Sequence, residues 1–151
     1  MSLLFHYKLD AVQHAIVPLG GRWSRPRPRI LVSLIGPSKT HPTEGLLDTG
    51  ADDTVFPESF AAYIGVDLAN TPTGQMTTAT MANAPVRYAQ VSLRITDGTE
   101  YHEWPAYVGF IPAKLYLPLL GFAGFLQFFT ATFRGDREEV ELTTNSLYPG
   151  T

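Results

Sequence analysis

Residues 46–57 read Leu-Leu-Asp-Thr-Gly-Ala-Asp-Asp-Thr-Val-Phe-Pro, and this stretch decides how the 151-residue chain is interpreted. Two leucines precede Asp48, and the Thr-Gly pair after it predicts a turn. The pattern places a carboxylate at the end of an apolar strand, where backbone N–H groups can hold it and water is partly excluded. Such a position suits an acid–base catalyst. An ordinary turn is the alternative, but the aliphatic residues before Asp48 and the Ala-Asp pair after Gly50 favour the catalytic interpretation.

Size and composition indicate one folded domain. Hydrophobic residues make up 44% of the chain and charged residues 17%, which is typical of a globular protein. The formal net charge of -3 gives no basic face, so we expect no nucleic-acid partner. The absence of cysteine excludes disulfides and thiolate zinc sites and fits a reducing compartment, so we expect a cytoplasmic location. Four scattered histidines show no metal-ligand spacing, and we expect no metal.

One uncharged stretch imitates a membrane span. No charged residue lies between Lys114 and Arg134, and this length would cross a bilayer as a helix. Pro118, Gly121 and Gly124 interrupt it, so we interpret the stretch as buried elements and expect no membrane association. The apolar start of the chain meets charged residues too early for a secretory signal.

Short apolar runs between Gly and Pro residues predict an all-β domain. The expected strands are 5–9, 30–35, 44–48, 87–95, 100–104, 106–110, 115–119, 128–133 and 138–143. Asp97-Gly98 predicts a tight hairpin after the fourth of them.

Two short helices are expected among the strands. One covers 57–64 and ends at Gly65, and the other covers 122–127. The Arg-Pro repeat at 25–29 predicts an extended, linker-like connection, because residues before proline avoid the helical region. We therefore divide the chain into an N-terminal extension at 1–28, formed by a strand and this connection, and a domain at 29–151. Trp23 and Trp104 are interpreted as packing residues.

Three stretches, taken together, resemble retropepsin-like aspartic proteases, with small bacterial members the most similar. The first is the Asp48 loop, and the second is 85–93, which is similar to the strand that returns from the family's flap. The third is Leu119-Leu120-Gly121, similar to the hydrophobic-hydrophobic-Gly motif that passes beneath the catalytic loop. The resemblance covers about 27–143. It implies a single-lobed closed barrel with one or two short helices that pairs as a symmetric dimer.

The resemblance also implies a chemistry and a partner. Aspartic proteases use two neighbouring carboxylates, one protonated and one ionised, to activate water. This chain supplies one such aspartate, Asp48, and a two-lobed enzyme would need about twice the length. The resemblance therefore implies an aspartic endopeptidase that works as a homodimer on a peptide or protein substrate, without a cofactor.

Site residues follow from the same resemblance. Thr49 would brace the two loops across the dimer, Gly50 would let the backbone approach, and Leu119, Leu120 and Gly121 would pack beneath the loop. The expected substrate-binding residues are Ala51, Asp52, Asp53, Ala79, Thr80, Met81 and Ala82.

Two departures from the family leave alternatives open. Many relatives have Arg where this chain has Phe122, so Asp52 would need another partner or would lie in water. The segment that corresponds to the family's flap, residues 74–84, is rich in Thr and Ala rather than Gly. A non-proteolytic domain that binds peptides or mediates assembly is the first alternative. The second is a zymogen whose residues 1–28 cover the cleft or block dimerisation.

Overall fold

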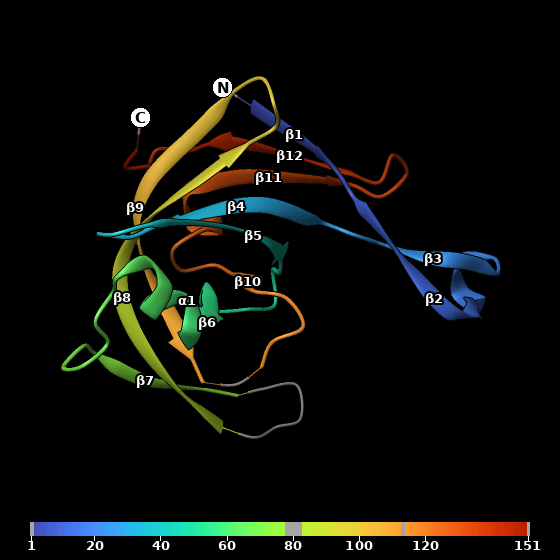
Figure 1. Ribbon diagram of the computed structural model, residues 1–151. Coiled ribbons are helices and arrows are strands. Elements are labelled where there is room, and N and C mark those ends of the chain that lie inside the picture. The colour runs from blue at the N-terminus through green and yellow to red at the C-terminus, as the bar shows by residue number, and fades with distance from the viewer. Residues whose placement is uncertain (1, 78–82, 113, 151) are drawn as a thin grey trace.

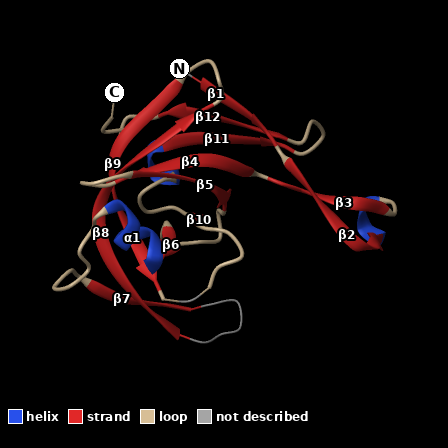
Figure 2. Ribbon diagram, viewed as in Figure 1, coloured by secondary structure: helices blue, strands red, loops and turns tan. Residues whose placement is uncertain are grey.

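Strands dominate the protein, as Figures 1 and 2 show. The computed structural model describes residues 2–77, 83–112 and 114–150. The strands are β1 (Ser2–His6), β2 (Lys8–Ile16), β3 (Arg22–Arg27), β4 (Arg29–Ile35), β5 (Thr40–Leu47), β6 (Val55–Pro57), β7 (Thr73–Thr77), β8 (Asn83–Thr96), β9 (Tyr101–Ile111), β10 (Leu119–Leu120), β11 (Phe129–Arg134) and β12 (Glu139–Thr144). The helical elements are α1 (Glu58–Ile64) and the single 3-10 turns η1 (Val17–Leu19) and η2 (Leu126–Phe128). The prediction of a mostly β fold is confirmed.

The largest sheet has the strand order β4-β5-β10-β6-β9-β8-β7. β4 pairs with β8 as well, which joins the first strand of this order to the sixth. In β8, buried and exposed residues alternate, and Ala89, Val91, Leu93 and Ile95 form its buried side. The alternation explains why this strand is recognisable in the sequence, since side chains of a strand point to opposite faces in turn.

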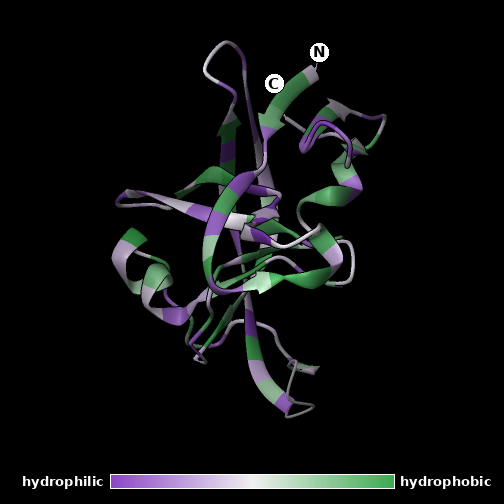
Figure 3. Ribbon diagram, turned by 90° about the vertical axis from the view of Figure 1, so that its right-hand side faces the viewer, coloured by the Kyte–Doolittle hydropathy of each residue, from purple (hydrophilic) through white to green (hydrophobic). Residues whose placement is uncertain are grey.

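A smaller sheet with the order β1-β12-β11 covers the core from the other side (Figure 1). Leu3 of β1 and Leu142 of β12 are fully buried with Trp104 of β9 in one hydrophobic cluster. The ring of Phe129 lies 5.1 Å from that of Trp104, centroid to centroid. β1 therefore packs as part of the body. Figure 3 shows hydrophobic and hydrophilic segments following one another along the strands, as expected for elements with one buried face.

β2 and β3 form a separate two-stranded hairpin that projects from the body (Figure 1). We call residues 8–27, which comprise β2, η1 and β3, the arm. The linker interpretation of 25–29 is wrong, because Arg25, Pro26 and Arg27 pair with β2 and Arg29 begins β4. Extended backbone is what residues before proline prefer, and a strand satisfies that preference as well as a linker does. Trp104 is buried as predicted, but Trp23 is 63% exposed, so its interpretation as a packing residue is wrong.

Five expected elements differ from the structure. The strand at 5–9 is divided at Tyr7 between β1 and β2. The strand at 115–119 is reduced to the two residues of β10, since Tyr116 is exposed and the preceding segment bends. The helix at 122–127 is wrong: Gly124 has φ +88°, which interrupts a helix, and only the turn η2 forms. The strands at 100–104 and 106–110 are one continuous strand, β9, with Pro105 on its exposed side.

The first helix and the hairpin at Asp97-Gly98 are confirmed. α1 ends at Gly65, whose φ of 86° places it in the left-handed conformation that closes many helices. The β8–β9 hairpin turns at Asp97 and Gly98, and β11 with β12 forms the C-terminal hairpin. The uncharged stretch between Lys114 and Arg134 contains β10, η2 and most of β11. In the described part of the chain, no helix has both the length and the apolar character needed to span a bilayer.

Candidate active site

Asp48 lies immediately after the buried end of β5, at the start of the loop that leads to β6. Its backbone N–H donates to the carbonyl of Leu120 at 3.1 Å, and its carbonyl accepts from Ala51 at 3.2 Å. The carboxylate oxygen Oδ1 accepts from the N–H of Gly50 at 2.9 Å. Strand end and turn therefore fix the carboxylate in place while it remains partly accessible to water.

β10 forms the floor of this loop. Leu119 and Leu120 pair in parallel with Leu46 and Leu47 of β5, and Leu119 also pairs with Val55 of β6. A short strand between β5 and β6 thus holds both ends of the loop that carries Asp48. The structure brings Leu119, Leu120 and Gly121 beneath the loop, where the sequence analysis placed them.

Gly121 lets the backbone after β10 touch the backbone of the loop that carries Asp48. A Cβ at this position would lie 2.3 Å from the carbonyl oxygen of Asp53 and 2.6 Å from that of Ala51. No side chain fits at such distances, so the hydrophobic-hydrophobic-Gly pattern follows from backbone contact. The N–H groups of Phe122 and Ala123 donate to the carbonyls of Ala51 and Asp52 at 2.9 Å and 2.8 Å. Loop and floor are therefore joined through backbone hydrogen bonds.

A groove of about 560 Å³ opens above the loop. One wall is the loop at 48–54 between β5 and β6, which we call the catalytic loop after its expected role. The other wall is β7, which pairs with β8 to form what we call the flap hairpin. Its lining residues are Asp48, Gly50, Ala51, Asp52, Asp53, Gln75, Met76, Thr77, Leu115 and Leu119. The groove is large enough for part of an extended peptide.

The groove gathers three of the seven residues expected to bind substrate. Ala51, Asp52 and Asp53 line it, whereas Ala79, Thr80, Met81 and Ala82 lie outside the described residues. Thr49 is exposed at the tip of the loop. The sequence analysis missed Gln75, Met76 and Thr77, although their antiparallel pairing with the expected return strand could have indicated them. No pattern in the sequence indicated that Leu115 would line the groove.

Tyr88 joins the flap hairpin to the catalytic loop. Its hydroxyl donates to Oδ2 of Asp53 at 2.8 Å. Partial burial, this hydrogen bond and the negative charge of Asp53 raise the pKa of Tyr88 to about 12. Asp52 is exposed. Of the neighbouring aspartates Asp52 and Asp53, it is thus Asp53 whose carboxylate has a side-chain partner among the described residues. That partner comes from β8 rather than from the position of Phe122, whose side chain is 60% exposed.

Three features define a protein of the retropepsin-like class. They are the loop between β5 and β6, the strand β10 beneath it and the β7–β8 hairpin across the groove. The family model described as Aspartyl protease matches residues 34–121, more than half of the chain. The chain belongs to the retropepsin-like aspartyl protease family.

Comparison with solved structures supports the same fold. The structure is similar to a retropepsin-like aspartic protease from Rickettsia conorii, with a TM-score of 0.55 and 18% sequence identity. The alignment covers 94% of this chain and 90% of that chain. No curated protein matches the sequence.

Proposed function

We propose that the protein is a homodimeric aspartic endopeptidase in which Asp48 of each subunit supplies one of the two catalytic carboxylates. The observation that carries the proposal is the placement of Asp48 on the floor of the groove, held by Gly50 and by β10. Membership of the aspartyl protease family supports it. A single chain has one such loop, so a two-fold axis must bring the second Asp48 to the first.

The chemistry follows from two carboxylates that share one proton. The ionised carboxylate takes a proton from a water molecule, and the water oxygen forms a bond to the scissile carbonyl carbon. The protonated carboxylate donates its proton to the carbonyl oxygen, which gives a tetrahedral diol. When the carbonyl re-forms, one hydroxyl of the diol gives its proton to the carboxylate that is now ionised. The C–N bond breaks, and the amine nitrogen leaves with the proton of the other carboxylate. Because the two groups titrate together, neither proton belongs to one particular subunit.

The groove fits a substrate in extended conformation. Strand β7 and the loop at 50–53 face the groove from opposite sides, and both offer backbone groups to a peptide. Main-chain hydrogen bonds would then provide affinity, and pockets for alternate side chains would provide selectivity. Thr49 at the exposed loop tip would contact its counterpart across the two-fold axis.

Asp48→Asn tests the proposal, because it removes the ionisable group with little change in shape. We expect cleavage of a mixed peptide library, read by mass spectrometry, to fall at least a thousandfold, the order expected when a catalytic triad member is removed. Asp136→Asn is the matched control, since Asp136 is an exposed carboxylate in the turn between β11 and β12. Cleavage by Asp48→Asn at the rate of this control would refute the proposal.

A further inference from the structure

The arm packs little apolar surface on the body of its own chain, and beyond its base it is joined to the body by the ion pair of Arg22 with Glu138. Among its residues, only Ile16 is buried, and its two strands pair with each other alone. A two-stranded hairpin without a hydrophobic face to pack on is marginally stable in water. Its extension away from the body (Figure 1) therefore calls for a surface on which it can pack.

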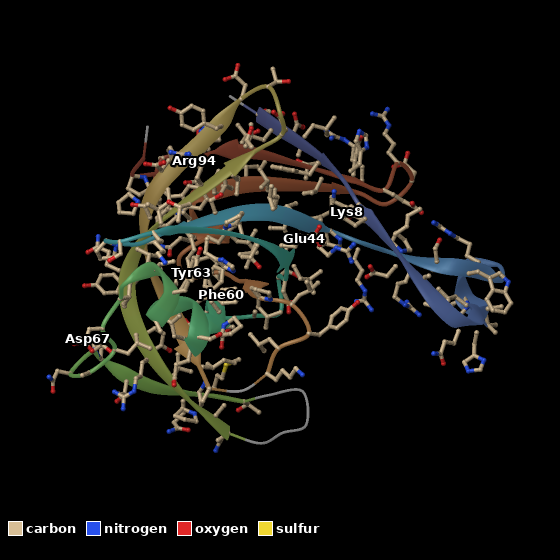
Figure 4. The ribbon with its side chains drawn as sticks, in the orientation of Figure 1. Lys8, Glu44, Phe60, Tyr63, Asp67 and Arg94 are labelled. Carbon is tan, nitrogen blue, oxygen red and sulfur yellow. The ribbon has the colours of Figure 1, made fainter. Side chains whose placement is uncertain are left out.

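Ion pairs set the direction in which the arm leaves the body. Asp10 of β2 pairs with Arg27 and Arg29, and Arg29 also pairs with Glu44 of β5. Figure 4 shows Lys8 and Glu44 close to this junction. These side chains tie the base of the arm to the strand that ends at Asp48.

The base of the arm also adjoins the catalytic loop. The carbonyl of Pro28 accepts from the N–H of Leu47 at 3.0 Å, and Leu47 directly precedes Asp48. The arm consequently leaves the body beside the end of β5. If a two-fold axis passes between two copies of Asp48, the second subunit lies near the same side of the molecule as the arm.

The far end of the arm is apolar and exposed. Val17 is 86% exposed and Trp23 is 63% exposed, and Leu19 between them is exposed as well. Large apolar side chains gathered on a projecting element are typical of contact surfaces, and tryptophan is enriched among residues that dominate binding energy.

Charge identifies the surface that complements the arm. Four cationic residues against one carboxylate give residues 8–27 a formal charge of +3, so the remainder of this chain of net charge -3 carries -6. The cationic residues are Lys8, Arg22, Arg25 and Arg27. Arg22 and Arg27 already pair with Glu138 and Asp10, whereas Lys8 and Arg25 form no ion pair with any described residue. A basic arm and an acidic body are complementary when two copies meet.

We propose that the arm packs on the body of a second copy of this chain, within the homodimer on which the proposed function rests. The catalytic loop and the segment after β10 expose few residues for a dimer contact, namely Thr49, Gly50, Asp52 and Phe122. A stable interface takes roughly 800 Å² from each partner, so more surface is needed than this loop offers. Two arms related by the two-fold axis supply it. A nucleic-acid partner fits less well, because the exposed Val17, Leu19 and Trp23 give the far end of the arm an apolar surface. Of the arm's four cations, only Lys8 and Arg25 have no ion pair with a described residue.

Trp23→Asp places a carboxylate on the apolar end of the arm and leaves the core untouched. We expect its dimer dissociation constant, measured by sedimentation equilibrium, to rise at least tenfold above that of the wild type. Leu147→Asp is the matched control, since Leu147 is also 63% exposed and lies near the C-terminus, away from the arm. A dissociation constant for Trp23→Asp equal to that of the control would overturn the proposal.

A photo-crosslinking amino acid in place of Val17 provides a second measurement without a change of charge. In a mixture of ordinary and ¹⁵N-labelled chains, we expect crosslinked peptides of mixed isotope composition that map to the partner's body. Crosslinks confined to one chain, or to nucleic acid, would overturn the proposal.

The outcomes separate this proposal from the proposed function. A dimer whose activity needs Asp48 but whose stability ignores Trp23→Asp overturns the arm contact alone. A dimer that Trp23→Asp disrupts, but that cleaves no peptide, leaves the arm contact and refutes the protease. A chain that stays monomeric at all concentrations overturns both.

Discussion

Asp53 and Asp52 are neighbours in the sequence, yet they lie in different environments. One carboxylate oxygen of Asp53 accepts from Tyr88, while Asp52 is exposed. Gly74 leaves room for the ring of Tyr88, because a Cβ at Gly74 would lie 2.9 Å from that ring. A single tyrosine thereby ties the flap hairpin to the catalytic loop. Asp52, the aspartate expected to need another partner because position 122 is Phe, is exposed instead.

Tyr88→Phe removes this hydrogen bond and keeps the ring. Because the acceptor is a charged group, we expect the free energy of unfolding to fall by about 1–2 kcal/mol at pH 7. The pKa of Tyr88 is raised from 10.0 to about 12, so the folded protein favours the neutral hydroxyl. The stability that Tyr88 contributes is therefore complete below pH 10 and is lost as the pH rises through about 12.

Thermal unfolding between pH 7 and pH 12 checks whether the stabilisation by Tyr88 decreases as the pH rises. The difference in melting temperature between wild type and Tyr88→Phe should narrow above pH 10. Tyr107→Phe serves as the control, since Tyr107 is 63% exposed. A difference that is constant over the whole range would contradict the assigned role of Tyr88.

Among the strands in the described part of the chain, β10 is the shortest, and it lies directly beneath the catalytic loop. It has two residues, yet it pairs with β5 and β6 and so holds both ends of the catalytic loop. Leu120 is fully buried and lies over Gly45, where a Cβ would approach its side chain to 2.8 Å. The glycine in β5 thus makes room for the leucine in β10.

Leu120→Ala should leave a cavity directly beneath the loop. We expect a loss of about 2–5 kcal/mol in the free energy of unfolding, measured by urea denaturation, as for other buried leucines. Leu147→Ala truncates an exposed leucine and should change the stability by less than about 0.5 kcal/mol. Equal stability of the two variants would show that β10 does not anchor the loop.

The sequence predicts those elements whose signals are local. The Asp-Thr-Gly turn, the alternation of β8 and the glycine that ends α1 each depend on a few neighbouring residues. The helix expected at 122–127 fails because Gly124 adopts a positive φ that the apolar pattern does not reveal. The Asp53–Tyr88 contact joins residues 35 positions apart, and no local pattern indicates it.

At the scale of the molecule, the arm shows why composition alone misleads. Its Arg-Pro repeat is compatible with a linker, and its two strands lack the buried side that reveals β8. The sequence analysis interprets Trp23 as a packing residue, but its side chain is exposed on a projecting hairpin. Under the proposed arm contact, Trp23 would pack on the second chain. The sequence of one chain does not show which residues pack on a partner.

The central claim is that one active site needs Asp48 from two chains. Mixing wild type with Asp48→Asn at constant total concentration, after subunits have exchanged, tests it directly. Because the variant is nearly isosteric, chains should pair at random, and a heterodimer with one carboxylate should be inactive. An equal mixture should then retain about a quarter of the wild-type activity, since about one dimer in four contains two wild-type chains. Retention of about half, as expected when each chain acts alone, would contradict the account.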